Sequence, residues 1–220
     1  RLSNALDDIR DLHGGLSDFT LLHQETGVNF HPERNCWTAR EWAPAAREVN
    51  LMGDFNEWSK ANHPLKKDPD GYWSLELPGH ALVHRQLVKL HVLGADGSRY
   101  DRIPATIRRA VQDPSTHGYA GQIWEPGTYQ WLHEFDPSII TSPTIYESHV
   151  GMAGEEPRVH SYHEFTSEVL PRIAAAGYNT VQLMAVAEHP YYGSFGYHVS
   201  SLFAPCSRFG TPEDLKHLID

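Results

Sequence analysis

The spacing of apolar residues changes twice along the chain. Within residues 1–22 they recur at helical intervals until a Gly-Gly pair, which predicts a short leading helix. From about Phe30 the interval becomes two, in short runs such as "CWTAREWAP" and "YWSLELP" that Gly, Pro, Asp and Asn separate. The pair Asp96-Gly97 predicts a type I′ hairpin turn. Several strands at this spacing predict an antiparallel, immunoglobulin-like β-sandwich of about 100 residues.

The pattern changes again after the polar linker "HEFDPSIITSP". The runs "TIYESHVG" and "NTVQLMAV" predict two buried strands, and the segment between them predicts a helix that Ser161 and Glu164 cap and Pro171 kinks. A second helix is expected to start after Thr211 as its N-cap. Alternating strands and helices predict parallel β/α construction. Two such units neither close a barrel nor cover their own edges, so we expect a truncated domain.

The amino-acid composition of the chain argues against several classes of function. Acidic residues outnumber basic ones 28 to 18, for a formal charge of −10, which argues against a nucleic-acid or anionic-membrane surface. No apolar run approaches the roughly 20 residues that span a bilayer. Cys36 and Cys206 lie far apart and predict no disulfide framework, which favours a reducing compartment. The 15 histidines include close pairs in "HALVH" and "HSYH", but no carboxylate accompanies them at ligand spacing, so we expect neither a metal site nor a cofactor.

One stretch has more aromatic residues than a core strand needs. The apolar run Val181–Val186 is followed by Tyr191, Tyr192, Phe195 and Tyr197 within a short loop pattern. Aromatic rings beyond the end of a buried strand are suited to stacking on the apolar face of a sugar ring. For the first three of these rings, packing of the loop against a neighbouring module stays open as an alternative.

The amino-acid sequence of this region resembles that of a known family. The stretches "REWAPAAREVNLMGDFNEW", "IYESHVGMAGEEPRVHSYHEF" and "EHPYYGSFGYHVSSLFAPCSRFGTPEDLKHLID" are similar to 1,4-α-glucan (glycogen or starch) branching enzymes of glycoside hydrolase family 13. The resemblance covers nearly the whole chain. It implies a multidomain chain with a helical segment at 1–22, a family 48 carbohydrate-binding module at 23–133, and the first β/α units of an incomplete (β/α)8 TIM barrel at 134–220.

The same resemblance implies two groups of glucan-binding residues. At the carboxyl-end rim of the barrel, Tyr197 matches the tyrosine that the family places beneath the sugar before the bond to be cut, with Phe195 and His189 as neighbours. On the sandwich, the positions that hold a glucan in related modules correspond to Trp58, Lys89 and Tyr100. The position of Tyr100 is often Trp in the family.

A further glucan-facing patch is implied at Trp42 and Pro44 in "REWAP". The structural alternative is that Trp42 and Trp73 belong to the core of the sandwich. For Trp73, whose strand alternates cleanly, the core is the preferred interpretation. For Trp58, which lies in a polar turn, we prefer sugar contact.

The implied reaction is retaining cleavage of an α-1,4 link by an Asp nucleophile and a Glu acid/base, followed by transfer to a glucan 6-hydroxyl. Neither Glu147 nor Glu188 matches these catalytic residues, which the resemblance places beyond residue 220. We therefore expect no catalytic residue in this chain, and expect the chain alone to bind α-glucan without rearranging it.

Two alternatives stay open, a debranching-type relative of the same hydrolase family and a non-catalytic glycogen-binding adaptor. The partial barrel argues against the adaptor, and the "EHPYYGSFGYHV" wording favours branching over debranching. The expected partner is glycogen, starch or a malto-oligosaccharide, with no nucleic acid and no membrane. The expected compartment is the cytoplasm, or a plastid if the source is a plant.

Overall fold

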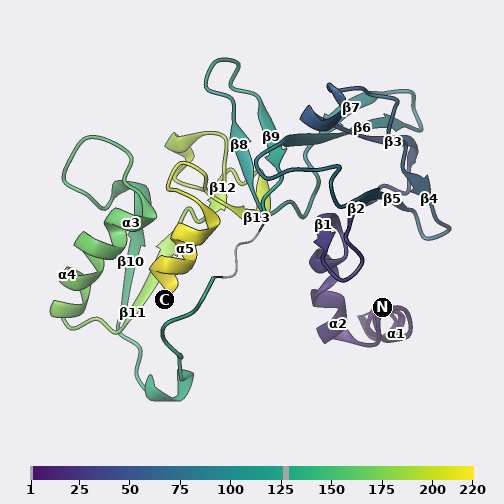
Figure 1. Ribbon diagram of the computed structural model, residues 1–220. Helices are drawn as coiled ribbons and strands as arrows, with labels where there is room; N and C mark the ends of the chain where they lie inside the picture. Colours follow the sequence, from purple (N-terminus) through teal and green to yellow (C-terminus); the bar gives the residue numbers. More distant parts are fainter. Residues whose placement is uncertain (1, 126–128) are drawn as a thin grey trace. The chain divides into compact units, whose positions relative to one another are not determined.

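The computed structural model describes residues 2–125 and 129–220 (Figure 1). The chain divides into two compact units, Arg1–Thr106 and Ile107–Asp220. No helix in the described part of the chain is both long and apolar enough to cross a membrane. The domain limits expected from the sequence, at residues 22/23 and 133/134, remain predictions.

The first unit begins with helices and continues as two antiparallel sheets. Its helical lead consists of α1 (Leu2–His13), α2 (Leu16–Thr20) and the 3-10 turn Leu22–Gln24. One sheet has the order β1-β2-β5-β4, formed by β1 (Gly27–His31), β2 (Cys36–Trp42), β5 (Tyr72–Pro78) and β4 (Lys66–Lys67). In the other sheet, β6 (Leu87–Gly94) pairs with β3 (Ala46–Gly53) and also with β7 (Arg99–Arg102).

Alternation along β5 places its apolar residues in the core, as the sequence predicted. Trp73 and Leu77 are buried and Leu75 is half-buried, whereas Ser74 and Glu76 are exposed. The apolar residues of both sheets are buried together: Trp37, Ala39, Val49, Leu51, Trp73, Leu77, Val88 and Leu90. Two antiparallel sheets with a shared apolar core fit a β-sandwich.

The hairpin between β6 and β7 differs from the expected type I′ turn. The N–H of Gly97 donates to the carbonyl of Gly94 at 3.0 Å, and the N–H of Gly94 donates to the carbonyl of Ser98 at 2.8 Å. Only Gly97 in this loop has a left-handed backbone, with φ of 83°, whereas a type I′ turn needs two such residues. The loop is therefore a three-residue type with Ala95, Asp96 and Gly97 at its tip, and the prediction of the turn type was wrong.

The second unit begins with a β-hairpin and continues as alternating strands and helices. The hairpin consists of β8 (Ala110–Gln112) and β9 (Tyr119–Gln122). The later elements, in order, are the 3-10 turn Pro137–Ile139, β10 (Ile145–His149), the 3-10 turn Val150–Met152, α3 (Tyr162–Glu164), a π-turn at Phe165–Val169, α4 (Leu170–Ala175), β11 (Thr180–Met184), β12 (Ala187–Glu188), the 3-10 turn Tyr192–Ser194, β13 (Ser201–Pro205) and α5 (Pro212–Ile219). The pair β10 and β11 is parallel, and β12 pairs antiparallel with β13.

The helix between β10 and β11 starts and breaks where its sequence predicted. Ser161 accepts a hydrogen bond from the N–H of Glu164 at 3.2 Å, and the Glu164 carboxylate accepts one from the N–H of Ser161 at 2.8 Å. The π-turn that separates α3 from α4 directly precedes the turn that contains Pro171, which cannot donate to the helical ladder. Gly177 ends the segment with a left-handed φ of 90°.

The two parallel strands are less buried than predicted. In β10, Ile145, Tyr146 and Glu147 are exposed, and β11 is at most half-buried. Parallel strands become buried when further strands flank them and helices cover both faces. Among the described residues, β10 and β11 pair only with each other, and Val181 and Leu183 pack on one side against the helix core around Phe165 and Phe209. The expectation of two buried strands was therefore wrong.

The cap of α3 has a pH-dependent component. The hydrogen bond from Arg158, followed by those from Ser161, lowers the pKa of Glu164 from 4.5 to about 2. A carboxylate whose pKa is lowered by folding stabilises the fold above its unfolded pKa, and this stabilisation is lost as the pH falls toward the folded pKa. We expect Glu164→Gln to lower the free energy of unfolding at neutral pH, and the difference from the wild type to vanish as the pH falls from 4.5 toward about 2.

Urea unfolding across this pH range measures the difference. Glu168→Gln is the matched control, because Glu168 lies on the next helical turn and is exposed. A Glu164→Gln difference that stays constant with pH, or one that Glu168→Gln reproduces, contradicts the prediction.

Candidate functional site

The loop after β12 presents aromatic rings to solvent. In this segment, named here the aromatic loop (residues 189–200), Tyr191, Phe195 and Tyr197 are exposed, and Tyr197 is the most exposed residue of the three at 78 %. A ring that serves only packing would be covered by its neighbours. Tyr192 fits that description, because it is half-buried with its ring 5.8 Å from that of His149 in an edge-on arrangement.

The backbone before Tyr197 is held by a tight turn. Phe195 and Gly196 have left-handed φ values of 55° and 86°. A Cβ atom on Gly196 would lie 2.4 Å from the Cα of Ala185, so only glycine permits this close approach of the loop to the end of β11. The N–H of Tyr197 donates to the carbonyl of Ser194 at 3.0 Å. The chain therefore fixes the position from which the Tyr197 ring projects.

His189, expected beside Tyr197, is fully buried in the structure. Its Nδ1 lies 3.0 Å from the carbonyl oxygen of Ala187, and its ring lies 6.3 Å from that of Phe209. Its Nε2 is buried without a hydrogen-bond partner among the described residues. Burial, and then the charge of His189, lowers the pKa of nearby His149. The structure thus brings Phe195 and Tyr197 to an open surface but not His189.

An ion pair between a buried glutamate and a half-buried arginine anchors the aromatic loop, and no sequence pattern had indicated it. Glu188, the last residue of β12, is 0 % exposed and lies 3.5 Å from Arg208. Its other carboxylate oxygen accepts the N–H of Ser207 at 2.6 Å. Arg208 donates to the carbonyl of His189 and, at 2.8 Å, to that of Pro190, the first two residues of the loop.

The same guanidinium reaches the β8–β9 hairpin. Arg208 donates to Gln112 on β8 at 3.1 Å and to the hydroxyl of Tyr119 on β9 at 2.9 Å. Burial, followed by the negative charge of Glu188, raises the pKa of Tyr119. These contacts join residues that are up to 96 positions apart in sequence, so no local spacing could have revealed them.

On the sandwich, Trp58 and Lys89 lie close to the start of β6. The indole N–H of Trp58 donates to one carboxylate oxygen of Asp54 at 3.0 Å, and the other oxygen accepts the N–H of Leu87 at 2.7 Å. Asp54 therefore ties the half-open indole to the strand that carries Lys89 two residues later. Glu57 and Trp58 both have left-handed backbones, which turn the indole outward from the end of β3.

Tyr100 lies on the other face of this sheet. It is directly opposite Val92 on β6, and residues directly opposite each other project to the same face. Lys89 is three residues from Val92 and therefore projects to the opposite face. A two-residue turn would have placed Tyr100 opposite Leu93, on the face of Lys89, but the three-residue loop shifts the register by one. Tyr100 is exposed, with the Arg102 guanidinium 4.7 Å from its ring centre.

Trp42 is exposed at the end of β2 and is not a core residue, in contrast to Trp73. Its indole N–H donates to the carbonyl of Asp70 at 3.3 Å. Its ring lines an open pocket of about 1050 Å³ together with Phe19 and Tyr72. Pro44 is exposed two residues beyond Trp42. Within the described parts of the chain, no group of three or more His, Cys, Asp or Glu residues could hold a metal ion.

A family model and several known proteins are similar in sequence to this chain. Residues 25–107 match the family model for carbohydrate-binding module 48, the isoamylase N-terminal domain. A 1,4-alpha-glucan-branching enzyme of Oryza sativa subsp. japonica, described as chloroplastic/amyloplastic, is 46 % identical over 100 % of this chain and 28 % of its own length. The corresponding enzyme of Dictyostelium discoideum is 40 % identical over 100 % of this chain and 33 % of its own length.

Solved structures support the fold alone, because their identity to this chain is low. The Group B Streptococcus pullulanase SAP has a TM-score of 0.73 at 17 % identity, covering 88 % of this chain and 31 % of its own. The pullulanase of Bacillus acidopullulyticus has a TM-score of 0.68 at 21 % identity, covering 88 % of this chain and 27 % of its own. The chain thus spans about a quarter to a third of the proteins it matches. The chain is similar over its full length to part of the 1,4-alpha-glucan-branching enzymes, and its residues 25–107 match the model of carbohydrate-binding module 48.

Proposed function

We propose that this chain is the glucan-binding and rim-forming part of a longer 1,4-α-glucan branching enzyme. That enzyme cleaves an α-1,4 link with retention and transfers the released segment to a 6-hydroxyl, which forms an α-1,6 branch in glycogen or starch. The observation that carries the proposal is the exposed ring of Tyr197, on a loop beyond the second parallel strand, in a chain 40–46 % identical to branching enzymes.

The second half of the chain is proposed to be the start of a (β/α)8 barrel. The parallel pair β10 and β11, the helical crossover between them and the following helix α5 are the elements with which such a barrel begins. The open face of β10 suits a strand whose remaining neighbours come from other parts of the sheet. Active sites of these barrels lie beyond the carboxyl ends of the strands, where the aromatic loop follows β11.

In this proposal Tyr197 stacks under the sugar that precedes the cleaved bond, with Phe195 beside it. His189, expected as a second neighbour, is fully buried and is proposed to support the loop from beneath without touching the sugar. The catalytic carboxylates come from other parts of the longer enzyme. Glu188 is unsuited to that role, because it is fully buried and both its oxygens are within hydrogen-bond or ion-pair distance of Ser207, Tyr119 and Arg208. Glu147 is exposed on β10 and matches neither catalytic position.

The sandwich is proposed to hold glucan at a surface formed by Trp58 and Lys89, and at a second patch formed by Trp42 and Pro44. Tyr100 is proposed as a separate contact on the opposite face of the sheet. An exposed indole offers its flat face to the C–H groups of a glucose ring, and the Lys89 ammonium can donate to its hydroxyls.

The pullulanases support the debranching alternative only in that their fold is similar to that of this chain. The relatives from Oryza sativa and Dictyostelium discoideum, 46 % and 40 % identical to this chain, are named as branching enzymes, which favours branching. A non-catalytic adaptor is disfavoured, because the relatives' names describe enzymes. The proposed partner is α-glucan, without nucleic acid, membrane or cofactor, and the proposed compartment is the cytoplasm, or a plastid in a plant.

Replacing Trp58 with Ala tests the sandwich surface. We expect the variant to move faster than the wild type through a native gel that contains glycogen, because the stacking face of the indole is lost. A stacking contact contributes roughly 1–3 kcal/mol, so retention should fall about tenfold. The matched control is Trp131→Ala, which removes another exposed indole from outside the sandwich. Unchanged mobility of Trp58→Ala, or equal acceleration of both variants, contradicts a glucan-binding role for Trp58.

A further inference from the structure

The second unit contains a buried histidine, His149, at the carboxyl end of its first parallel strand. It is the last residue of β10 and is 8 % exposed. Both of its ring nitrogens are buried without a hydrogen-bond partner among the described residues. Because these nitrogens have almost no accessible surface, a group from another part of a longer protein could not reach them without displacing what covers them. The packing of this unit therefore determines the surroundings of the ring.

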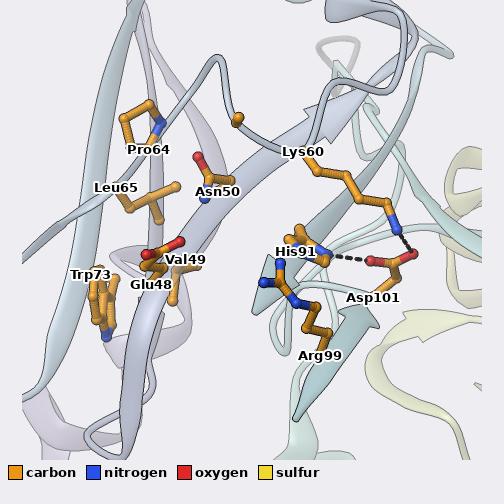
Figure 2. Close-up of a pocket in the computed structure, with 11 residues that line it drawn as sticks. Glu48, Val49, Asn50, Lys60, Pro64, Leu65, Trp73, His91, Arg99 and Asp101 are labelled. Carbon is orange, nitrogen blue, oxygen red and sulfur yellow. Dashed lines mark hydrogen bonds and ion pairs between the residues drawn. The ribbon is translucent and has the colours of Figure 1, made fainter. Parts of the chain in front are cut away.

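A buried histidine of the sandwich, His91, is paired with a carboxylate and provides a contrast. It is 7 % exposed, and Figure 2 shows its ring directed toward Asp101 on the neighbouring strand. The Nδ1 of His91 lies 2.7 Å from a carboxylate oxygen of Asp101. A proton on His91 would thus have a counter-charge, whereas the charge that acts on His149 is that of a second base, His189. Both burial and His189 oppose a proton on His149.

The ring of His149 packs edge-on against three aromatic rings. Two belong to the aromatic loop, Tyr192 at 5.8 Å and Phe195 at 6.4 Å between ring centres, and the third is Phe209 at 5.6 Å. These distances lie within the range in which edge-on aromatic pairs attract each other. Burial raises the pKa of Tyr192, so its hydroxyl stays protonated and all three rings are uncharged.

The other elements packed around His149 provide no counter-charge from the described residues. On β11, the residue opposite His149 is Met184, which is uncharged. On β12, the two carboxylate oxygens of Glu188 are engaged by a backbone N–H and by the guanidinium of Arg208. Beyond β13, burial raises the pKa of the Cys206 thiol to about 11, so this thiol is neutral. A positive charge on the His149 ring would therefore remain buried and unpaired, which is costly.

The contacts of His149 lie next to the turn that carries Tyr197. Phe195, one of the three rings against His149, is two residues before Tyr197. Gly196, between them, packs against Ala185 just beyond β11. The turn before Tyr197 therefore rests on the ends of both parallel strands, and His149 is its contact at the end of β10.

We propose that His149 is a positioning residue for the aromatic loop: its neutral ring holds the turn that carries Tyr197, and its protonation releases that turn. The inference rests on the proposed function, because the position of the loop affects branching only if Tyr197 stacks on the sugar. The reaction itself needs no proton from His149, which acts through the loop alone.

The sign of the pH dependence follows from the burial of the ring. Burial lowers the pKa of His149 in the packed loop, and opening of the loop returns it toward the ordinary value of about 6.5. The packed loop then binds fewer protons than the open loop. Its stability is complete above about pH 6.5 and falls below that value, by at most about tenfold in the ratio of packed to open loop per pH unit.

Amide hydrogen exchange of residues 189–200 in the full-length protein, corrected for the intrinsic effect of pH on exchange, tests the loop directly. Between about pH 7.5 and about pH 5.5 we expect the corrected exchange of the wild type to become up to about tenfold faster. In His149→Phe, which keeps a ring but cannot take a proton, the corrected exchange should not change with pH. NMR titration of the His149 ring in the wild type adds a test that does not depend on the folding of the variant.

The matched control is His160→Phe. His160 is 4 % exposed and both its ring nitrogens are buried without a partner among the described residues, but it lies 3.9 Å from Glu164 at the start of α3. This variant should leave the pH dependence of the aromatic loop in place. The proposal is overturned by a wild-type loop whose corrected exchange is independent of pH, by a His149→Phe loop that keeps the wild-type dependence, or by a His149 ring that titrates at or above the ordinary pKa of about 6.5.

The branching rate of the full-length enzyme separates this inference from the proposed function. We expect kcat of the wild type to fall relative to that of His149→Phe, by up to about tenfold over the same pH range. If exchange of the loop depends on His149 but the two kcat profiles coincide, the positioning of the loop stands and the stacking role of Tyr197 fails. If Tyr197→Ala lowers kcat while exchange does not depend on His149, the proposed function stands and this inference fails.

Discussion

Replacement of Arg208 by Met is expected to lower the free energy of unfolding by about 3 kcal/mol, because it leaves the carboxylate of Glu188 buried without its counter-charge. The N–H of Ser207 still donates to Glu188, which keeps the effect at the lower end of the range for a broken buried pair. Urea unfolding of the wild type and the variant measures this difference.

A double substitution separates the charge effect from simple loss of packing. Glu188→Gln combined with Arg208→Met removes both charges and retains an oxygen that can accept the N–H of Ser207. We expect the double variant to be more stable than Arg208→Met alone. Arg172→Met is the surface control, since Arg172 and Glu155 form an exposed pair at 3.2 Å and its loss should cost less than about 1 kcal/mol. If the double variant is no more stable than the single one, the buried charge of Glu188 is not the cause.

The same substitution should loosen the aromatic loop. Arg208 donates to the carbonyls of His189 and Pro190, where the loop begins. Amide hydrogen exchange in residues 189–200 is therefore expected to become faster in Arg208→Met, and to do so more than in Arg172→Met.

Replacement of Tyr197 by Ala in the full-length enzyme is expected to lower kcat about ten- to a hundredfold, with little change in melting temperature. In this chain the residue is 78 % exposed, so removal of its ring uncovers little surface that the described fold buries. In the proposed site the ring stacks under the reacting sugar, and loss of such a contact in the transition state costs roughly 1–3 kcal/mol. The iodine-spectrum shift of amylose follows the branching rate.

Two companion variants sharpen this test. Tyr197→Phe keeps the stacking face and should keep most of the activity, because no hydrogen bond of the Tyr197 hydroxyl supports the described loop. Leu202→Ala removes another highly exposed apolar side chain, on β13, and should leave kcat unchanged. A much lower melting temperature for Tyr197→Ala, with activity per folded molecule intact, would show that Tyr197 is a packing residue.

Much of the local structure followed from the sequence because it depends on neighbouring residues. The cap formed by Ser161 and Glu164, the break near Pro171 and the N-cap at Thr211 each rest on hydrogen bonds within a few positions. The alternation of β5 predicted its buried face, including the core position of Trp73. The sequence resemblance of the aromatic loop to the family pointed to Tyr197 and Phe195, and both residues are exposed in the structure.

The arrangement of the candidate functional site could not be predicted from neighbouring residues in the sequence. The hairpin between β6 and β7 differs from the expected turn, and this one difference moves Tyr100 to the face opposite Lys89. The bonds of Arg208 to Glu188 and to Gln112 on β8 join distant parts of the chain, so their spacing carries no signal. The buried position of His189 likewise depends on the ring of Phe209, which lies 20 positions later in the chain.

The sequence by itself determined the caps at Ser161 and Thr211, the break near Pro171, the apolar face of β5 and the similarity to branching enzymes. The tertiary structure alone decided which strands are covered, which face each ring reaches, and how Arg208 meets Glu188 and Gln112. The physical reason is the distance along the sequence between the residues that interact. Caps and alternation arise from forces between residues close in sequence, whereas burial, register and ion pairing depend on residues that only folding brings together.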